Sequence, residues 1–240
     1  MEYFNRRGEK LKLDIGELSY LNSGSCARLL HNDTVVFKRY FRFTEDCYRL
    51  EPKIFDLLKS INSPHMVEIF DIYTSDFLSK NEKCEHNFRT DAYTAKYYKD
   101  NECRVLFEST DYILDNFREL EVLFNILSDS LVWLDDVKRE NSILSSNSII
   151  IIDPDLFHFS DNSKDSILIN NKRKLLSLFR SICFWGINDL STEQFKTTAW
   201  DNMDKLIDEV KISENTDVTY EIAKHLQYVK RPIDYFTRKF

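Results

Sequence analysis

Glycine and proline are scarce in this chain, which has only four of each among its 240 residues. Few flexible linkers are therefore expected, and the chain should form a compact globule. Hydrophobic residues make up 42% and charged residues 30%, an ordinary balance for a globular protein. Aromatic residues, at 14%, are abundant. A chain of this length can bury a proper core in one or two domains.

The cysteines and histidines lack the spacing of metal or redox motifs. The five cysteines include no C-x-x-C pair, so neither a zinc site nor thioredoxin-like chemistry is expected. The five histidines are equally dispersed. An odd number of cysteines and the absence of a signal peptide at the amino terminus favour a reducing compartment, so we expect a cytoplasmic location.

Long apolar runs and an excess of positive charge are also missing. No apolar run approaches the roughly 18 residues that a membrane-spanning helix needs. The net charge is −7, which provides no attraction for nucleic acids or anionic membranes. We therefore expect no nucleic-acid partner and no membrane partner.

The most informative segment that is present runs from Asp136 to Asp153, DVKRENSILSSNSIIIID. An aspartate, a lysine and an asparagine follow the spacing D-x-K-x-x-N, and a second aspartate closes the segment. Phosphoryl transfer requires a group that positions the attacking hydroxyl, a cation that neutralises phosphate charge, and oxygen ligands for Mg²⁺. Asp136, Lys138, Asn141 and Asp153 can supply these roles in that order.

The alternative interpretation of this segment is a solvated turn, because such residues favour loops. The flanking pattern argues against it. Two short apolar runs, 142–144 and 149–152, are joined by Ser-Ser-Asn-Ser and predict a hairpin. A hairpin would hold Asn141 and Asp153 at one end, where their side chains can converge on one ion.

A lysine also lies inside a predicted strand. Residues 18–21, 27–30 and 34–40 read as three strands, and Lys38 lies in the third among β-branched and aromatic residues. A charge there is costly unless it faces a ligand or a partner. By itself such a lysine is more often on the exposed face of an edge strand, but with the downstream segment it indicates a phosphate-binding cation.

With these residues the chain resembles the protein-kinase-like superfamily over residues 18–157, and is most similar to small, divergent bacterial Ser/Thr protein kinases. Val-Val-Phe-Lys38 matches the family's V-A-I-K strand. The catalytic-loop pattern H-R-D-L-K-x-x-N falls on residues 134–141, where the aspartate, lysine and asparagine match and the first two positions do not. Asp153-Pro-Asp stands where the family has D-F-G.

The resemblance implies ATP and Mg²⁺ as cofactors. It implies that the catalytic residues are Asp136 and Lys138, that the phosphate-binding lysine is Lys38, held by Glu51, and that the metal ligands are Asn141 and Asp153. Glu51 belongs to an amphipathic helix predicted over 48–61, with Pro52 in its first turn. Glu45 is the alternative partner for the lysine.

The nucleotide-covering loop and the hinge are assigned by the same resemblance. The family's glycine-rich loop falls on residues 22–29, where only Gly24 of its glycines remains, and Leu21 and Leu29 flank it as nucleotide contacts. The hinge falls near Lys96, Tyr97 and Tyr98, whose backbone N–H and C=O groups could take an adenine edge.

Three departures from the family pattern carry predictions. Asp135 replaces the arginine that receives a phosphorylated activation loop, so activation by that route is not expected. Pro154 predicts a stiff turn after the metal ligand. Asp155 could add a carboxylate near the metal or cap the next turn, and we favour the cap.

The expected fold is α+β, with a two-lobed kinase-like arrangement. Residues 1–98 should form a β-rich N-lobe with one main helix, including later strands near 66–73 and 90–98. Residues 99–240 should form a reduced helical C-lobe. Its helices are predicted at 112–133, at 172–184 with Asn170 and Asn171 as caps, and at 192–210 and 218–229.

Three functions remain open at this point. The expected function is that of an ATP- and Mg²⁺-dependent kinase acting on a hydroxyl, with a protein acceptor favoured. The eroded glycine-rich loop and Asp153-Pro-Asp also fit a pseudokinase that acts as a regulatory binding module. The absence of an A-P-E-like segment fits a small-molecule kinase. The sequence predicts neither the identity of the acceptor nor an oligomeric state.

Overall fold

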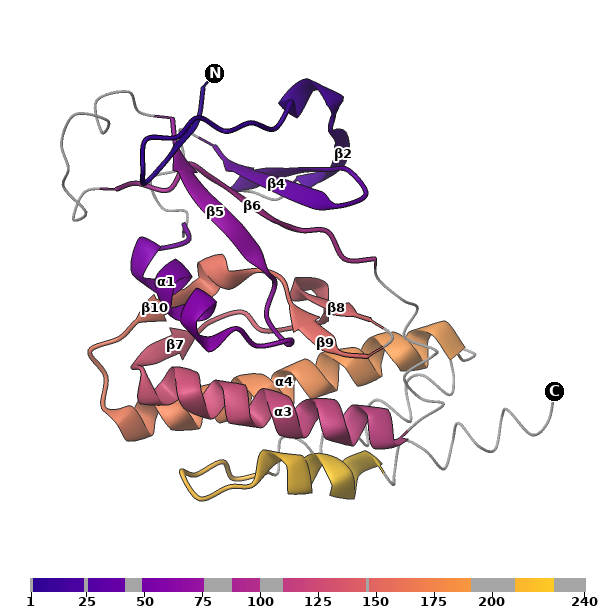
Figure 1. Ribbon diagram of the computed structural model, residues 1–240. Helices are drawn as coiled ribbons and strands as arrows, with labels where there is room; N and C mark the ends of the chain where they lie inside the picture. Colours follow the sequence, from indigo (N-terminus) through magenta and orange to yellow (C-terminus); the bar gives the residue numbers. More distant parts are fainter. Residues whose placement is uncertain are drawn as a thin grey trace. The chain divides into compact units, whose positions relative to one another are not determined.

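The computed structural model describes residues 2–23, 26–41, 49–75, 88–99, 110–145, 147–190 and 210–226. They form an α+β structure, which confirms the predicted fold class (Figure 1). The chain divides into two compact units, one of Met1–Lys99 with Asp153–His158 and one of Asp100–Ile152 with Phe159–Phe240. The first unit therefore takes in a short segment that follows the hairpin, in addition to the amino-terminal residues.

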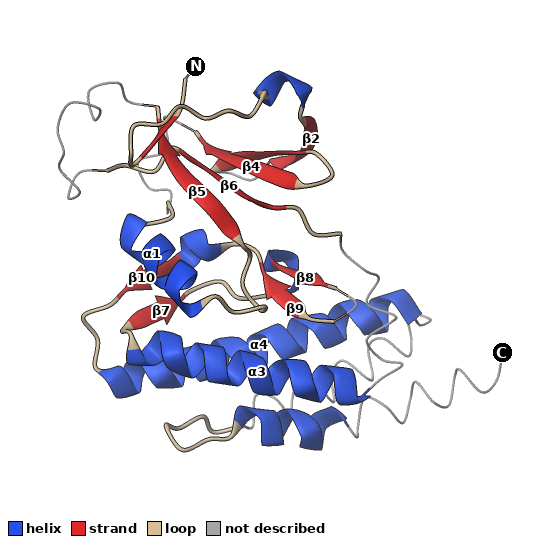
Figure 2. Ribbon diagram, in the orientation of Figure 1, coloured by secondary structure: helices blue, strands red, loops and turns tan. Residues whose placement is uncertain are grey.

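The first unit is built on a six-stranded antiparallel sheet (Figure 2). Its strands lie in the order β1-β5-β6-β4-β3-β2. They are β1 (Phe4–Asn5), β2 (Ser19–Ser23), β3 (Ala27–His31), β4 (Val35–Tyr40), β5 (Ile69–Thr74) and β6 (Ala92–Lys96). The five strands predicted beyond residue 17 are confirmed to within a few residues. Every neighbouring pair is antiparallel.

Strand β4 directs Phe37 into the apolar core on one face of the sheet and Lys38 to the opposite face. Phe37 is fully buried and meets the Tyr3 ring edge-to-face, with the ring centroids 5.4 Å apart. Tyr73 and Ala92 complete this core cluster. Because successive side chains of a strand point to opposite faces, Lys38 and Tyr40 lie on the other face of the sheet.

Helix α1 (Pro52–Ile61) follows the sheet's first four strands in the chain. Proline at its first position is compatible with a helix start, since that N–H has no partner within the helix. The helix buries Ile54, Phe55 and Leu58, and it ends at Asn62 in the left-handed conformation, with φ 49°. The predicted helix is confirmed, beginning a few residues later than expected.

The second unit contains two long helices, α3 (Thr110–Asp129) and α4 (Lys164–Leu190), which lie side by side (Figure 1). The rings of Phe117 and Phe179 meet edge-to-face across them, 5.6 Å between centroids. The remaining elements are β7 (Val132–Leu134), the 3₁₀ turn η4 (Arg139–Asn141), the hairpin β8 (Ser142–Leu144) and β9 (Ile149–Ile151), and a helix over 218–226. The predicted hairpin is confirmed, with Ser142 opposite Ile151.

Two predicted helix boundaries in the second unit are wrong. The helix expected to reach residue 133 ends at Asp129, because Leu131 adopts φ 61° and turns the chain into β7. Asn170 and Asn171 do not cap a helix, since they lie inside α4. The helix begins after Ser163, whose Oγ accepts the Ser166 N–H. The predicted helix at 192–210 lies almost entirely outside the described residues.

Two further observations concern membrane-spanning helices and the cysteines. Within the described ranges, no helix is both long and apolar enough to span a bilayer. Cys183 is buried, and Cys26 is disulfide-bonded. The disulfide differs from the reduced cysteines expected from the sequence.

Candidate active site

The segment that carries the predicted catalytic residues is held in place by a buried asparagine of α4. Asn171 accepts the Leu134 N–H at 3.1 Å and donates to the Val132 carbonyl at 2.8 Å. It also donates to Ser128 Oγ at 2.9 Å. Asn171 is therefore bonded to both ends of β7 and to the end of α3. These bonds fix the position of β7, from which the segment with Asp136 continues.

Asp136, Lys138 and Asn141 come together after β7, as the sequence predicts. Lys138 Nζ lies 2.6 Å from Asp136 Oδ2. Asn141 Nδ2 donates to the Asp136 carbonyl oxygen at 2.8 Å, and its distance to Oδ2 is 3.3 Å. The Asp136 and Lys138 side chains are both close to half exposed. A carboxylate, an ammonium group and an amide thus share one solvent-accessible site.

The turn that carries these side chains is fixed by buried packing and by hydrogen bonds to α4 and β8. Val137 is buried between the two charged residues. The Arg139 N–H donates to Ser181 Oγ of α4 at 2.8 Å, and its guanidinium donates to the Ser142 carbonyl at 2.8 Å. Asp135 accepts the Trp133 Nε1–H at 2.9 Å. The loop is therefore fixed by its own neighbours.

The hairpin brings the end of the segment back to Asn141. The N–H of Ile152 donates to the Asn141 carbonyl oxygen at 3.0 Å. Ile152 immediately precedes Asp153 in the chain. A single backbone hydrogen bond therefore sets the point from which the chain continues to the second predicted metal ligand.

Lys38 lies in β4 as a buried charge with three oxygen partners. Its Nζ is 2.6 Å from Asp153 Oδ1 and 2.7 Å from Asp155 Oδ2. It also hydrogen-bonds the Tyr93 hydroxyl, on the residue directly opposite in β6. An ammonium group has three protons to donate. The burial of this charge is therefore fully compensated, and the alternative of an exposed edge-strand lysine is excluded.

Asp155 is a buried partner of Lys38, so its prediction as a helix cap is wrong. Its side chain is 6% exposed, against 28% for that of Asp153. Oδ1 of Asp155 is buried without a hydrogen-bond partner. Burial raises the pKa of Asp155 to about 6, against the opposing charge of Lys38 and with a further increase from Asp153. The 3₁₀ turn η5 (Pro154–Leu156) directs Asp155 inward.

The two carboxylates keep Lys38 charged. Burial alone would lower the pKa of Lys38, but Tyr93, Asp155 and Asp153 together raise it above its ordinary value. The raised pKa of Lys38 and the raised pKa of Asp155 are compatible, because one cation cannot neutralise two carboxylates. The group as a whole therefore carries excess negative charge.

The structure does not pair Lys38 with Glu51. Glu51 is the N-cap residue of α1, with an exposed side chain that makes no capping hydrogen bond. The amphipathic pattern correctly located the helix, but it left open which carboxylate would meet the lysine. Asp153 and Asp155 occupy that position. Glu45, the alternative partner, lies outside the described residues.

The residues predicted to cover the nucleotide are only partly described. Gly24 lies outside the described residues. Leu29 is directly opposite Lys38 in the β3–β4 register and therefore lies on the same face of the sheet. Leu21 lies at a register shift in β2, and its side chain is exposed. Of the three, Leu29 is the one whose position beside the lysine is fixed by strand pairing.

The backbone amides at the predicted hinge are engaged within the sheet region. Lys96 donates its N–H to the Glu68 carbonyl and Tyr97 donates its N–H to the Thr34 carbonyl, both at 2.9 Å. The Tyr97 ring stacks on His31 with 4.8 Å between centroids. Neither of these N–H groups can bind an adenine edge without giving up a present hydrogen bond.

The donor set fits a magnesium ion. Among the described residues no group of three or more histidine, cysteine or acidic side chains is arranged to hold a metal. Magnesium in phosphoryl-transfer sites is bound by one or two protein oxygen ligands together with substrate phosphates. Asp153 is the more exposed carboxylate of a group with excess negative charge, and Asn141 offers an amide oxygen. Both are suitable ligands.

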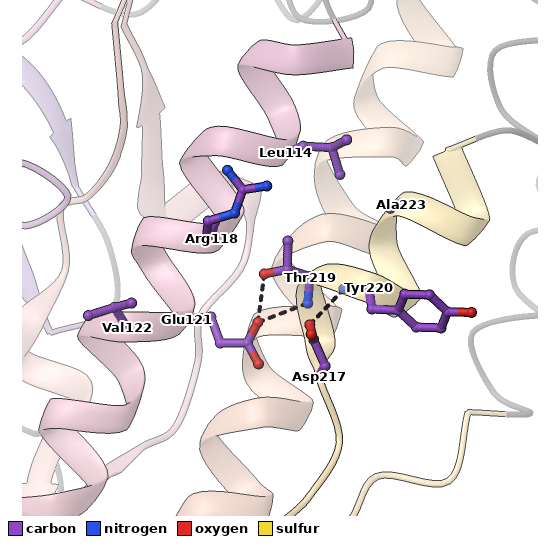
Figure 3. Close-up of a pocket in the computed structure, with 8 residues that line it drawn as sticks. All are labelled: Leu114, Arg118, Glu121, Val122, Asp217, Thr219, Tyr220 and Ala223. Atoms are coloured by element: carbon purple, nitrogen blue, oxygen red, sulfur yellow. Dashed lines mark hydrogen bonds between the residues drawn. The ribbon is translucent and has the colours of Figure 1, made fainter.

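A separate pocket of about 430 Å³ in the second unit contains none of the predicted site residues (Figure 3). The Glu121 carboxylate lies at its centre and accepts the N–H groups of Val218 and Thr219, each at 2.9 Å, and the Thr219 hydroxyl at 2.6 Å. These bonds cap the helix over 218–226. The Glu121 carboxylate in this pocket therefore joins α3 to the start of that helix.

Two tyrosines beside Lys38 were missed by the sequence reasoning. Tyr40 donates a hydrogen bond to Asp155 and accepts the Leu50 N–H at 3.1 Å. Tyr93 meets the lysine through the β4–β6 register. Alternation within β4 could have placed Tyr40 on the lysine's face. Tyr93 had no such indication, because a sequence does not specify which residues of two distant strands are paired.

Neither the known protein-family models nor the curated proteins include a match to this chain.

Proposed function

We propose that this protein is an ATP- and Mg²⁺-dependent phosphotransferase that transfers the γ-phosphoryl group to a hydroxyl, with a protein serine or threonine favoured as the acceptor. The observation that carries the proposal is the ion pair of Lys38 with Asp153, 2.6 Å long and 115 residues apart in the chain. The resemblance assigned a phosphate-binding role to one residue and a metal-binding role to the other. A two-lobed kinase-like arrangement is part of the same proposal.

On the first unit, Lys38 binds the α- and β-phosphates of the nucleotide. Two carboxylates keep it protonated, and Asp153 releases it toward the phosphates when that carboxylate binds the metal. Leu29, on the same face, contributes an apolar contact next to it. Asp153 is the metal ligand on this unit.

On the second unit, Asp136 positions the acceptor hydroxyl and takes up its proton, since a carboxylate within hydrogen-bond reach is a suitable base. Lys138 neutralises charge on the transferring phosphoryl group and is already within 2.6 Å of Asp136. Asn141 supplies an amide oxygen to the metal. A Mg²⁺ ion held by Asn141 and Asp153 would supply positive charge that offsets the negative charge of the phosphates.

The preference for a protein acceptor rests on Lys138. A lysine two positions after the base resembles Ser/Thr protein kinases, whereas small-molecule kinases of similar fold often carry histidine there. A small-molecule kinase is the alternative that the missing A-P-E segment supports.

The test is incubation with γ-labelled ATP and Mg²⁺, with the protein itself and a generic basic protein as acceptors. Wild type is compared with Asp153→Ala and with Asp161→Ala, an exposed aspartate outside the site. Label that disappears only in Asp153→Ala supports a protein kinase. Absence of both label and a nucleotide-dependent rise in Tm contradicts the proposal.

A nucleotide-binding pseudokinase is the second candidate function. It is favoured by the engaged N–H groups of Lys96 and Tyr97, which reduce the donors available to an adenine ring. A rise in Tm with ATP, without label on any protein and without phosphorylation in a metabolite panel, would support this function. Phosphorylation of one metabolite would instead support the small-molecule kinase.

A further inference from the structure

Asp155 has the properties of a residue that holds Lys38 in place. Its Oδ2 is 2.7 Å from Lys38 Nζ, a charge-assisted hydrogen bond of ordinary length. It is almost fully buried, so water does not compete for the contact. The Tyr40 hydroxyl donates to the same carboxylate and is itself fixed by the Leu50 N–H. The carboxylate is therefore oriented from two sides.

Asp155 and Asp153 belong to one short turn. Pro154 lies between them at the first position of η5, and the Phe157 N–H closes the turn on the Pro154 carbonyl. Proline fixes φ near −65°, which restricts how far the two carboxylates can move relative to each other. The proposed metal ligand and the lysine's buried partner are therefore held by the same turn.

Helix α1 is attached to the sheet region by contacts that do not involve Glu51. Arg49, just before the helix, donates to Asp91 at 2.9 Å and to the Thr90 and Phe41 carbonyls at 3.0 and 3.1 Å. The Leu50 N–H donates to Tyr40. The helix start is thereby fixed while the Glu51 side chain remains in solvent.

We propose that Asp155 is the positioning residue that holds Lys38 for nucleotide binding, in the place of a glutamate on helix α1. The inference rests on the proposed function and deepens it. Asp153 is then available as the metal ligand, because Asp155 retains the lysine. Placement of the lysine then depends on the turn at Pro154, and the Glu51 side chain takes no part in it.

The first measurement is the affinity for Mg·ATP of Asp155→Asn and of its matched control Glu51→Gln. Both changes convert a carboxylate to an amide of the same shape. Asp155→Asn should weaken binding about tenfold, as expected for the loss of one charge-assisted hydrogen bond, whereas Glu51→Gln should leave it unchanged. Thermal unfolding of each variant accompanies the titration, which is performed well below its Tm.

The second measurement separates positioning from a general structural role. In a Lys38→Met background, Asp155→Asn should cause no further loss of Mg·ATP affinity, because its effect acts through the lysine. A purely structural effect would instead add to that of Lys38→Met. If Lys38→Met does not fold, the same comparison is made with Lys38→Arg. In that background Asp155→Asn should weaken Mg·ATP binding by a different factor than it does in wild type.

The outcomes distinguish this inference from the proposed function. Equal weakening by Glu51→Gln and Asp155→Asn, or no effect of Asp155→Asn while wild type binds Mg·ATP, overturns the positioning role and leaves the function standing. Failure of wild type to bind Mg·ATP overturns the function and the positioning role together. A selective and non-additive effect of Asp155→Asn supports both.

Discussion

Asp155 and Lys38 form a buried ion pair in which the lysine is shared with Asp153, so two carboxylates compete for one cation. The pair joins the turn after the hairpin to strand β4. One carboxylate is buried and the other partly exposed. Buried ion pairs are weak evidence for stability, because removing charges from water is costly. The proposed binding role for Lys38 therefore accounts for this pair better than a contribution to stability does.

The Asp155 carboxyl predicts a pH-dependent stability. Burial raises its pKa from 3.8 to about 6. The folded protein therefore binds this proton more tightly than the unfolded chain does. The stabilisation is fully present below about pH 4 and is lost as the pH rises through about 6. The free energy of unfolding of wild type relative to Asp155→Asn should fall by up to about 3 kcal/mol across this window.

Urea unfolding between pH 4 and pH 7, with EDTA and without nucleotide, measures this difference. Glu51→Gln is the control, since its exposed side chain should show no such trend. A difference between wild type and Asp155→Asn that is flat or increases with pH would show that the carboxyl titrates as an ordinary aspartate.

Asp136→Asn should reduce phosphoryl transfer about a hundredfold or more, because the amide cannot accept the proton of the acceptor hydroxyl. Affinity for Mg·ATP should change little. The adjacent Asp135→Asn is the matched control, because Asp135 accepts a hydrogen bond from Trp133 and has no role in the proposed chemistry. Rates of phosphoryl transfer from labelled ATP are measured for both variants. Equal rates in wild type and Asp136→Asn would show that Asp136 is not the base.

Asn171→Ala should destabilise the second unit by about 2 to 4 kcal/mol, because it leaves the Leu134 N–H, the Val132 carbonyl and Ser128 Oγ without their shared partner. Asn162→Ala, at an exposed position, is the control and should stay within about 0.5 kcal/mol of wild type. Chemical denaturation measures both. A small effect at Asn171 would mean that water replaces the amide.

Glu121→Ala should loosen the helix over 218–226 by about 1 to 2 kcal/mol, as expected for the loss of a capping group. Amide hydrogen exchange at Val218 and Thr219 should accelerate, while exchange in the centre of α3 is retained. Val122→Ala, at the exposed neighbouring position, provides the control. Unchanged protection at both amides would indicate that the carboxylate does not cap this helix.

Periodic patterns in the sequence predicted most elements correctly, and the errors have identifiable causes. The strands, the hairpin and helix α1 follow from local alternation and spacing, which depend on neighbouring residues alone. The end of α3 was misplaced because Leu131, a residue with no preference for it, adopts a positive φ. Asparagine favours cap positions, which predicts Asn170 and Asn171 as caps. In the structure both lie inside α4, and their side chains hydrogen-bond to β7 instead.

The sequence by itself determined the α+β class and the clustering of Asp136, Lys138 and Asn141, because these residues are separated by at most one turn and a hairpin follows them. Only the tertiary structure decided the partner of Lys38. Glu51, Glu45, Asp153 and Asp155 were all carboxylates within possible reach in a linear chain. Strand pairing and the turn at Pro154 brought two of them to the lysine, and burial then made Asp155 the one shielded from water.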